Sequence, residues 1–315
     1  MFKPGQTWLD IDGNPIQAHG GGVNFFNGRY YWYGENKTGC SSKQPDGKPW
    51  HAGVNCYSSA DLYKWTFEGT VLPPVQDDPD HDLYPLKIMD RPHVLHNDRA
   101  GKYVMWMKLV DAGWRDQHVG IALADSPTGP FELLKSLHPN GMSAGDANLF
   151  KEPSDGKGYY VFDRPHTEIV VADLTADCLD TTGMYSCHFP LPGPPSAREA
   201  PSFFKWKHKY YMITSGTTWY HPNEAQWASA DLIHGPWTVH GNPCIGTRSA
   251  TTFDAQFTAV FELADRPGCF IGMADRWNVD DIEASTYVWL PIRIEAASLV
   301  IEWLDEWDLA WFDSA

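Results

Sequence analysis

Short runs of aromatic and β-branched residues, each introduced by a tight turn, recur along the chain. A turn followed by an apolar run, which in most cases contains Tyr or Phe, occurs five times. The five copies are residues 28–33, 101–106, 158–162, 208–213 and 268–273. Such residues bounded by turn signals favour strands, and no segment shows the helical periodicity of about 3.6 residues. The pattern therefore predicts five repeated units made of β-strands.

Each unit contains further strands on both sides of this run. A short apolar strand precedes every turn, at residues 22–26, 92–96, 147–151, 201–205 and 257–261. Because the two strands flank a turn, each pair is expected to form a hairpin. A third strand follows several of the runs and ends in a related phrase, at residues 121–131 and 228–237 and more weakly at 58–65 and 170–174.

Five units of three or four antiparallel strands predict an all-β protein with the architecture of a five-bladed β-propeller. We expect one domain over residues 1–315, closed into a ring by pairing of residues 8–10 with residues 303–309. Successive turns are separated by 73, 57, 50 and 60 residues, longer and less regular than the WD40 period of about 40–45 residues. A β-sandwich, the other architecture considered, does not explain a fivefold recurrence.

Composition narrows the classes of function. The chain has 40 acidic and 24 basic residues and a formal charge of -16. Nucleic acid and anionic membrane surfaces are therefore not expected as partners, because both would repel the protein. No run approaches the roughly 20 apolar residues that cross a bilayer. The 15 Trp, 14 Tyr and 15 Phe suit large packing surfaces and also a site that stacks on sugar rings.

The cysteines and the first residues say little about the compartment. Six cysteines without C-x-x-C spacing favour free thiols over a disulfide scaffold, a zinc site or a redox motif. Cys178 and Cys187 are the one pair expected to bond if the protein is exported. The first eight residues lack the apolar core of a signal peptide. The sequence is compatible with the cytoplasm as given, or with secretion or the periplasm if a leader was removed.

Polar residues stand at the start of the inner strand of every unit. In a propeller these strands line the central channel, so their starts converge at one end of the axis. Nine to twelve residues before the five turns lie, in chain order, His19, Asp90, Asp146, Glu199 and Gln256. Exposure of a strand end to solvent would explain a polar residue at any one of these positions. A polar residue at all five positions predicts a pocket on the axis. Crowded carboxylates raise each other's pKa, and glycoside cleavage needs such an acid, usually with a second carboxylate to activate water.

The sequence resembles glycoside hydrolase family 43 over nearly its whole length, and most closely the branch that contains exo-β-1,3-galactanases. The matching phrases are residues 16–22, 31–37, 91–94, 198–201, 275–277 and 287–291. The resemblance implies a five-bladed propeller that cleaves glycosides with inversion. It also implies that Glu199 is the general acid and that Asp146 orients this acid and modulates its pKa.

The residue at the position of the base that activates water differs from that of the wider family. Most members carry an aspartate in a first-blade Ala-Asp-Pro-like phrase, which here reads Ala18-His19-Gly20. The galactanase-like branch shares this loss, and the resemblance implies that Gln256 assists the water there. Asp90, where the branch usually has Glu, is the other candidate. Together with the changed stretch of residues 108–118, this shorter side chain alters the expected subsite for the terminal sugar.

Several further residues are candidate sugar ligands, namely Glu35, His19, Arg91, Thr218, Trp219 and Arg276. Glu35 either contacts a sugar hydroxyl or pairs with Lys37, and Trp219 either stacks on sugar or packs between blades. For His19 an ordinary hydrogen-bonded role is favoured over orienting water or binding a cation, and for Arg276 a pair with Asp275 is favoured. Trp114 is a second candidate platform. No metal or cofactor is predicted, although some relatives hold an axial cation such as calcium.

These observations leave a ranked set of functions. The first is an inverting, exo-acting glycoside hydrolase on galactose-containing plant polysaccharides, with an oligosaccharide or polysaccharide as its partner. The alternatives within the family are a β-galactofuranosidase and an α-L-arabinofuranosidase. A carbohydrate-binding propeller without catalysis is motivated by the absent first-blade aspartate, and a protein-interaction propeller ranks last. The sequence does not predict the oligomeric state.

Overall fold

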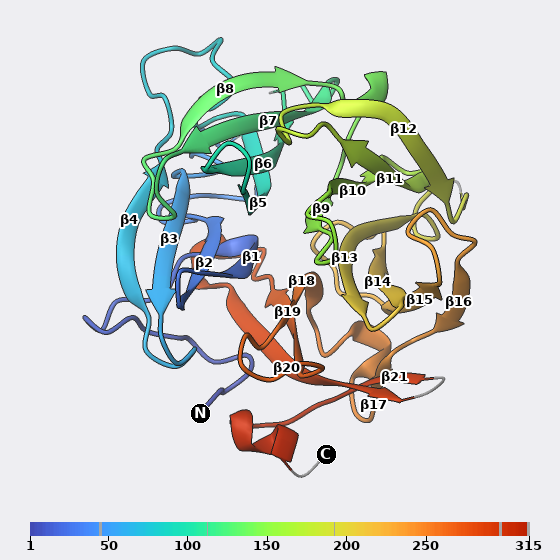
Figure 1. Cartoon of the computed structure of the whole chain (residues 1–315). Helices are drawn as coiled ribbons and strands as arrows, with labels where there is room; N and C mark the ends of the chain where they lie inside the picture. The colour runs from blue at the N-terminus through green and yellow to red at the C-terminus, as the bar shows by residue number, and fades with distance from the viewer. Residues whose placement is uncertain (44–45, 112, 192, 296–297, 314–315) are drawn as a thin grey trace.

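The alternation of turns and apolar runs produces sheets that radiate from one axis. The computed structural model describes residues 1–43, 46–111, 113–191, 193–295 and 298–313. Within this part of the chain the strands form five sheets arranged in a ring, and the helical segments are short 3-10 turns (Figure 1). The prediction of an all-β, five-bladed β-propeller is confirmed.

The first four blades each contain four antiparallel strands that follow one another from the axis outwards. The first blade consists of β1 (His19–Phe26), β2 (Arg29–Glu35), β3 (Val54–Ser59) and β4 (Thr66–Leu72). The second consists of β5 (Ile88–Asn97), β6 (Lys102–Val110), β7 (Gln117–Ala124) and β8 (Glu132–Leu137). The third consists of β9 (Ala147–Lys151), β10 (Gly158–Arg164), β11 (Glu168–Leu174) and β12 (Thr181–His188). The fourth consists of β13 (Arg198–Trp206), β14 (Lys209–Gly216), β15 (Gln226–Ala230) and β16 (Thr238–Gly241).

The fifth blade has five strands, and its outermost pair is parallel. In chain order its strands are β17 (Cys244–Ile245), β18 (Gln256–Glu262), β19 (Phe270–Arg276), β20 (Thr286–Glu295) and β21 (Ser298–Glu302). The 3-10 turns are η1 (Pro139–Gly141), η2 (Ser249–Thr251), η3 (Ile282–Ala284) and η4 (Leu309–Asp313).

The innermost strands β1, β5, β9, β13 and β18 contain the five predicted first strands. The Tyr- and Phe-containing runs form the second strands β2, β6, β10, β14 and β19, so the predicted hairpins are confirmed. Each hairpin places the end of its second strand beside the start of its first.

The two ends of the chain meet, but not in the predicted register. Phe2 pairs with Trp307, with a distance of 2.7 Å from the Phe2 amide nitrogen to the Trp307 carbonyl oxygen. Residues 8–10 do not join this contact, because Leu9 bridges to Pro15 and the amide of Asp10 donates to the Asn14 carbonyl. The local turn uses the backbone groups that the predicted pairing needs, so that pairing is wrong.

Most aromatic side chains are core. Trp32, Trp65 and Trp289 are buried together where the first and fifth blades meet, with ring centroids of Trp32 and Trp289 4.6 Å apart. Phe2 and Trp307 stack at 4.5 Å on the edge of the same cluster. Burial of such large apolar surfaces stabilises the contact between blades.

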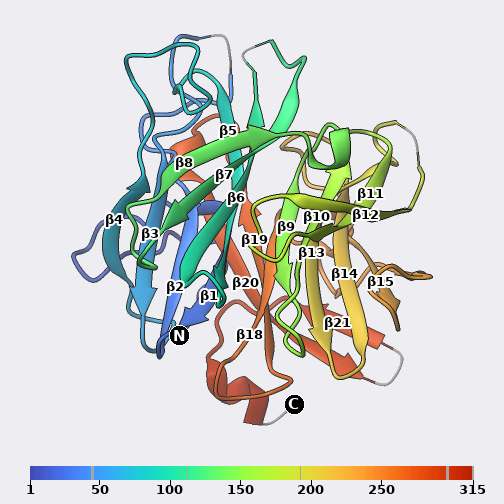
Figure 2. The same cartoon turned by 45° about the horizontal axis from the view of Figure 1, so that its top comes forward.

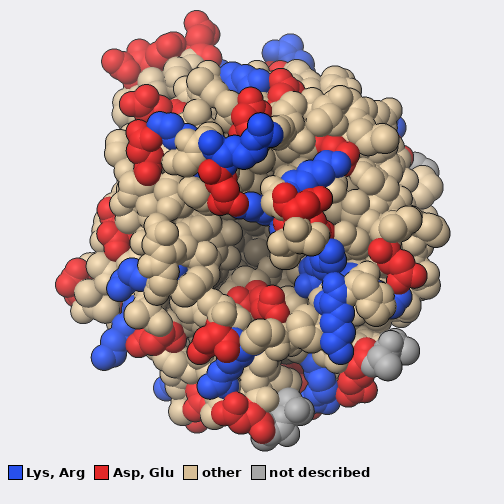
Figure 3. Space-filling view, in the orientation of Figure 1, with Lys and Arg blue, Asp and Glu red and all other residues tan. Residues whose placement is uncertain are grey.

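The two ends of the ring differ in their loops. The loops after β2, β4 and β6 extend to one end, and both chain termini lie toward the other (Figure 2). In the orientation of Figure 1 the surface is hollowed at the centre of the ring, with acidic and basic side chains close to the opening (Figure 3). No helix among the described residues has the length and apolar character needed to cross a membrane. All six cysteines are free thiols in the structure.

Candidate active site

One pocket of about 540 Å³ lies at the end of the axis where the inner strands begin. Its charged and amide side chains are Glu35, Asp90, Arg91, Lys108, Asp146, Glu199 and Gln256. Of the five polar residues predicted at the strand starts, His19 alone does not line it. The structure therefore brings together three carboxylates and an amide that are far apart in sequence.

Bulges after the polar residues turn the inner strands at the pocket. The hairpin register shifts directly after His19, Asp90 and Glu199, and one residue after Gln256. In the first three cases the next residue has a left-handed backbone, with φ of 67° at Gly20, 53° at Arg91 and 51° at Ala200. A bulge bends its strand and redirects the neighbouring side chains. Adjacent residues, such as Asp90 and Arg91, consequently both reach the pocket.

A second set of polar residues stands opposite the first, at the ends of the second strands. The facing pairs are His19 with Glu35, Asp90 with Lys108, Glu199 with Ser215 and Gln256 with Asp275. In the third blade the Asp163 amide donates to the Asp146 carbonyl oxygen at 3.0 Å. Asp163 and Ser215 were not predicted, and Lys108 was named only as the first residue of the altered stretch 108–118. All three lie within the last three residues of their second strands, opposite the starts of the first strands, so the hairpin arrangement itself points to them.

Asp146 is held between two cations. Arg91 Nη2 lies 2.7 Å from one carboxylate oxygen, and Lys108 Nζ lies 3.0 Å from the other. Burial opposes ionisation, but the two positive charges outweigh it and hold the pKa of Asp146 below its usual range. Asp146 is therefore an anion at neutral pH.

Glu199 is in the opposite state. Burial, followed by the negative charge of Asp146, raises its pKa to about 8, and Lys108 and Arg91 only partly offset this. Glu199 therefore carries a proton at neutral pH, as a general acid must. Two neighbouring carboxylates whose pKa values are driven apart form the acid–base pattern found in glycosidases.

Gln256 links the acid to Arg91. Arg91 Nη2 donates to the Gln256 oxygen at 2.6 Å, and the Gln256 nitrogen donates to Glu199 Oε1 at 3.1 Å and to Ser215 Oγ at 2.8 Å. A guanidinium can only donate, so the amide must present its oxygen to Arg91 and its NH2 to Glu199. Gln256 thus holds Glu199 in place through the same arginine that holds Asp146.

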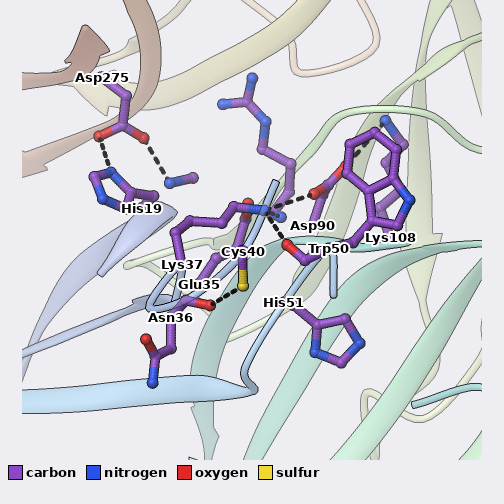
Figure 4. Close-up of polar contacts among 12 residues, drawn as sticks. His19, Glu35, Asn36, Lys37, Cys40, Trp50, His51, Asp90, Lys108 and Asp275 are labelled. Carbon is purple, nitrogen blue, oxygen red and sulfur yellow. Dashed lines mark hydrogen bonds and ion pairs between the residues drawn. The ribbon is translucent and has the colours of Figure 1, made fainter. Parts of the chain in front are cut away.

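On the first-blade side, Lys37 lies between Glu35 and Asp90 (Figure 4). Its Nζ is 2.6 Å from Glu35 and 3.7 Å from Asp90, and it donates to the Trp50 carbonyl at 3.0 Å. Burial raises the pKa of Glu35 to about 7, although Lys37 opposes the shift. Of the two predicted roles for Glu35, the pairing with Lys37 is present, and Glu35 also lines the pocket.

Tryptophans from three separate loops wall the mouth. Trp50, Trp114 and Trp219 follow β2, β6 and β14, and all three line the pocket. The ring centroids of Trp114 and Trp219 lie 5.2 Å apart, and those of Trp50 and Trp114 lie 5.6 Å apart. Trp114 is 42% exposed and Trp219 is 53% exposed, so both retain open surface. Trp50, Tyr220 and Trp277 also line the pocket, although none of them was among the predicted site residues.

His19 lies outside the pocket lining and packs beneath the site. It is fully buried, its ring stacks on Tyr287 at 4.8 Å, and its Nδ1 lies 3.6 Å from Asp275. Asp275 also accepts a 2.6 Å hydrogen bond from the Gly20 amide. His19 Nε2 faces the Tyr287 hydroxyl at 3.4 Å, whereas Nδ1 has no hydrogen-bond partner among the described residues, so ring packing on Tyr287 and the nearby carboxylate of Asp275 hold His19 at the start of β1.

Thr218 fixes the turn that carries Trp219. Its hydroxyl donates to the His221 carbonyl at 2.5 Å and accepts from Asn223 Nδ2 at 2.7 Å. Thr218 itself does not line the pocket. Its position suits indirect support of the mouth and not direct contact with sugar.

Arg276 lies away from the pocket. Its Nη2 donates to the Phe253 carbonyl at 2.7 Å, and its guanidinium lies 5.2 Å from the centre of the Trp303 ring. Successive residues of a strand point to opposite faces, so Arg276 turns away from the face on which Asp275 reaches β1. The favoured pairing of Asp275 with Arg276 is replaced by contacts of Asp275 with His19 and Gly20.

Comparison with known proteins gives a consistent family. Residues 26–258 match the model of glycosyl hydrolases family 43. A family 43 β-1,3-galactosidase is 34% identical with a TM-score of 0.90, over 99% of this chain and 64% of that chain. A second, solved with galactodeoxynojirimycin, is 33% identical with a TM-score of 0.90, over 98% of this chain and 100% of that chain.

A third structure is an exo-β-1,3-galactanase variant of Phanerochaete chrysosporium with β-1,3-galactotriose. It is 26% identical with a TM-score of 0.85, over 98% of this chain and 68% of that chain. No protein of curated function matches the sequence.

Proposed function

The chain belongs to glycosyl hydrolase family 43, and from this we propose that it is an exo-acting β-1,3-galactosidase that releases galactose from galactan ends with inversion. The observation that carries the proposal is the pair of Glu199 and Asp146. One carboxyl holds a proton and its neighbour is ionised, within a single pocket.

In this proposal Glu199 protonates the glycosidic oxygen as the bond to the leaving sugar breaks. Asp146 remains ionised, orients the acid electrostatically and keeps its pKa high, because a nearby anion disfavours a second negative charge. Arg91 holds Asp146 and Gln256 at 2.7 Å and 2.6 Å, so one guanidinium positions both partners of the acid.

We assign activation of the water to Asp90. Inverting hydrolysis requires a base on the face of the sugar opposite the acid. Gln256 has its oxygen engaged by Arg91 and its nitrogen by Glu199 and Ser215, and an amide is a weak base. Asp90 is a carboxylate that lines the same pocket, 3.7 Å from Lys37 and from Lys108.

Asp90→Asn tests this assignment with Gln256→Ala as its counterpart. We expect Asp90→Asn to lower kcat by about a hundredfold or more, the range of general base catalysis. Gln256→Ala should lower kcat less, because it loosens Glu199 without removing a base. If kcat of Asp90→Asn stays within tenfold of wild type while Gln256→Ala is inactive, the role passes to Gln256.

The shape of the pocket supports removal of a terminal sugar. The charged residues lie where the inner strands begin and the second strands end, and the three loop tryptophans surround the opening of the pocket. Aromatic faces stack on sugar rings, so Trp114 and Trp219 suit the sugar that follows the terminal one.

The test is product analysis with β-1,3-galactotriose. We expect galactose and the disaccharide as first products, with the released galactose initially in the α form by NMR, and no release by Glu199→Gln. Nitrophenyl galactofuranosides and arabinofuranosides, assayed in parallel, address the family alternatives. Faster cleavage of either, or products from the interior of longer galactan, would contradict the proposal.

A further inference from the structure

Two histidines and an aspartate meet beside the mouth of the pocket, outside the proposed catalytic machinery. Asp116 directly precedes β7, His118 is the second residue of β7, and His138 directly precedes η1. Their ligand atoms all lie within 4.8 Å of one another, and the ring centroids of the two histidines are 5.7 Å apart. His138 Nε2 lies 2.6 Å from one oxygen of Asp116, and His118 Nδ1 lies 3.2 Å from the other. We propose that this cluster is a binding site for a divalent metal ion of the zinc class.

The surroundings of His118 resemble those of a metal-binding histidine. Its Nε2 faces Asp82 Oδ1 at 3.6 Å, and Asp82 is held by a 2.6 Å hydrogen bond from Ser136 and by Lys87 at 3.8 Å. A carboxylate next to the ring nitrogen that faces away from the ion is a common feature of metal-binding histidines, and here it stands at ion-pair distance. The other ring nitrogen, Nδ1, is buried and makes no hydrogen bond of adequate geometry, although it points toward Asp116.

The donor set selects the class of ion. Two imidazoles with one carboxylate suit Zn²⁺ and Co²⁺, whereas calcium and magnesium prefer oxygen ligands alone. Ligands about 2.0–2.2 Å from a tetrahedral Zn²⁺ are themselves roughly 3.5 Å apart. On binding, the 2.6 Å contact between His138 and Asp116 must therefore widen, and ligand atoms up to 4.8 Å apart must approach one another. The His138 side chain is 42% exposed and free to make that adjustment. Three protein ligands leave the fourth position for water.

The site is connected to the pocket through the turn that precedes β7. The amide of Trp114 donates to the Asp111 carbonyl at 3.0 Å, and the amide of Asp111 donates to the Asp116 carbonyl at 3.1 Å. A metal bound by Asp116 would therefore anchor the base of the turn that carries Trp114. Resting on the proposed function, we expect the ion to strengthen binding of the sugar that follows the terminal one, without changing the chemical step.

Metal binding is measured first, on the full chain and without any substrate. After treatment with a chelator, the protein is titrated with Co²⁺, whose absorption reports ligand number and type, and then with Zn²⁺ as competitor. We expect one Co²⁺ per chain with a tetrahedral-type spectrum, displaced by Zn²⁺. His138→Ala and His118→Gln should each weaken binding by about tenfold or more.

The matched control is His96→Ala. His96 also pairs with an aspartate, Asp98, at 2.8 Å, but it is not part of a three-ligand group among the described residues. Its affinity for Co²⁺ should equal that of wild type. Absence of Co²⁺ binding by folded wild-type protein, or equal losses in His138→Ala and His96→Ala, would overturn the metal site.

The link to the pocket is measured separately. Zn²⁺ should lower KM for β-1,3-galactotriose by a few fold in wild type but not in His138→Ala, with hydrolysis of a nitrophenyl β-galactoside unchanged in both. An unchanged KM with metal bound would contradict the proposed effect of the ion on Trp114. It would leave the proposed metal site itself standing. An enzyme inactive on both substrates would contradict the proposed function instead, because the Co²⁺ titration needs no turnover.

Discussion

Glu199 is a half-buried and Glu35 a fully buried glutamate at the same end of the ring, and their surroundings give them different tasks. Burial is the largest influence on both, and it raises the pKa of Glu199 to about 8 and that of Glu35 to about 7. The second largest influence on the pKa acts in opposite directions in the two residues. For Glu199 it is the anion Asp146, which raises the pKa further, and for Glu35 it is the cation Lys37, 2.6 Å away, which lowers it.

The comparison teaches that burial alone does not make a general acid. Glu35 is only 2% exposed, and its carboxylate is engaged by Lys37 and by the Arg91 amide at 3.0 Å. Glu199 has Gln256 on one oxygen and a neighbouring anion. A buried carboxyl beside an anion keeps a proton to donate, whereas one beside a buried cation contributes mainly to structure.

The largest effect is expected for Glu199→Gln, which removes the proton donor while keeping the shape. We expect kcat on β-1,3-galactotriose to fall by about 10³–10⁴-fold, near the upper range for general acid catalysis. The folded pKa of Glu199, about 8, is above its ordinary value of 4.5, so the stability that its proton contributes is lost progressively as pH rises from about 4.5 to about 8. The variant should therefore gain thermal stability relative to wild type as pH rises from 5 to 9. Retained turnover in Glu199→Gln would contradict the assignment of Glu199 as the general acid.

Glu35→Gln should act in the opposite direction on stability. It leaves Lys37, which is 1% exposed, without its nearest counter-ion. Removing one partner of a buried ion pair costs roughly 3–5 kcal/mol, measurable by denaturant unfolding. Replacing both, as in Glu35→Gln with Lys37→Met, should recover part of the loss. A stability change as small as that of a surface substitution would contradict the structural role assigned to the pair of Glu35 and Lys37.

Asp146→Asn tests the anion that separates the two glutamates. We expect kcat to fall about a hundredfold, because Glu199 loses the neighbour that keeps it protonated. Wild-type activity should decline above pH 8 as Glu199 ionises, and this alkaline limb should move to lower pH in the variant. The check is a pH–rate profile of both proteins. A limb that stays in place would mean that burial alone sets the pKa of Glu199.

Trp219→Ala should have the smallest effect, because it changes the mouth and neither glutamate. Loss of one stacking face is worth about 1 kcal/mol, so KM for galactotriose should rise about fivefold with kcat nearly constant. Hydrolysis of a nitrophenyl β-galactoside should change less. Arg276→Ala is the control, since Arg276 contacts Phe253 and Trp303 instead of the pocket, and it should leave both kinetic constants within about twofold.

Much of the site could be predicted because the propeller repeats a local rule. A predicted polar residue lies at or within two residues of the start of each inner strand, and four of the five, all except His19, line the pocket. The same rule extends to the second strands, whose ends place Lys108, Asp163 and Ser215 beside the first set. The repeat did not show toward which side an individual side chain points. Thr218 and Arg276 stand near the site in sequence, but turn geometry and strand alternation place them outside the pocket lining.

The sequence by itself determined the strands, the hairpins and the fivefold repeat, because turns and alternating apolar residues act over a few neighbours. The candidate acid, Glu199, followed from the resemblance of its sequence phrase to family 43. The tertiary structure alone decided which carboxyl keeps its proton. Arg91 reaches Asp146 and Gln256, 55 and 165 residues away, and Asp146 raises the pKa of Glu199 across a blade boundary. Burial and Coulomb interactions depend on distances in space, and closure of the ring sets those distances.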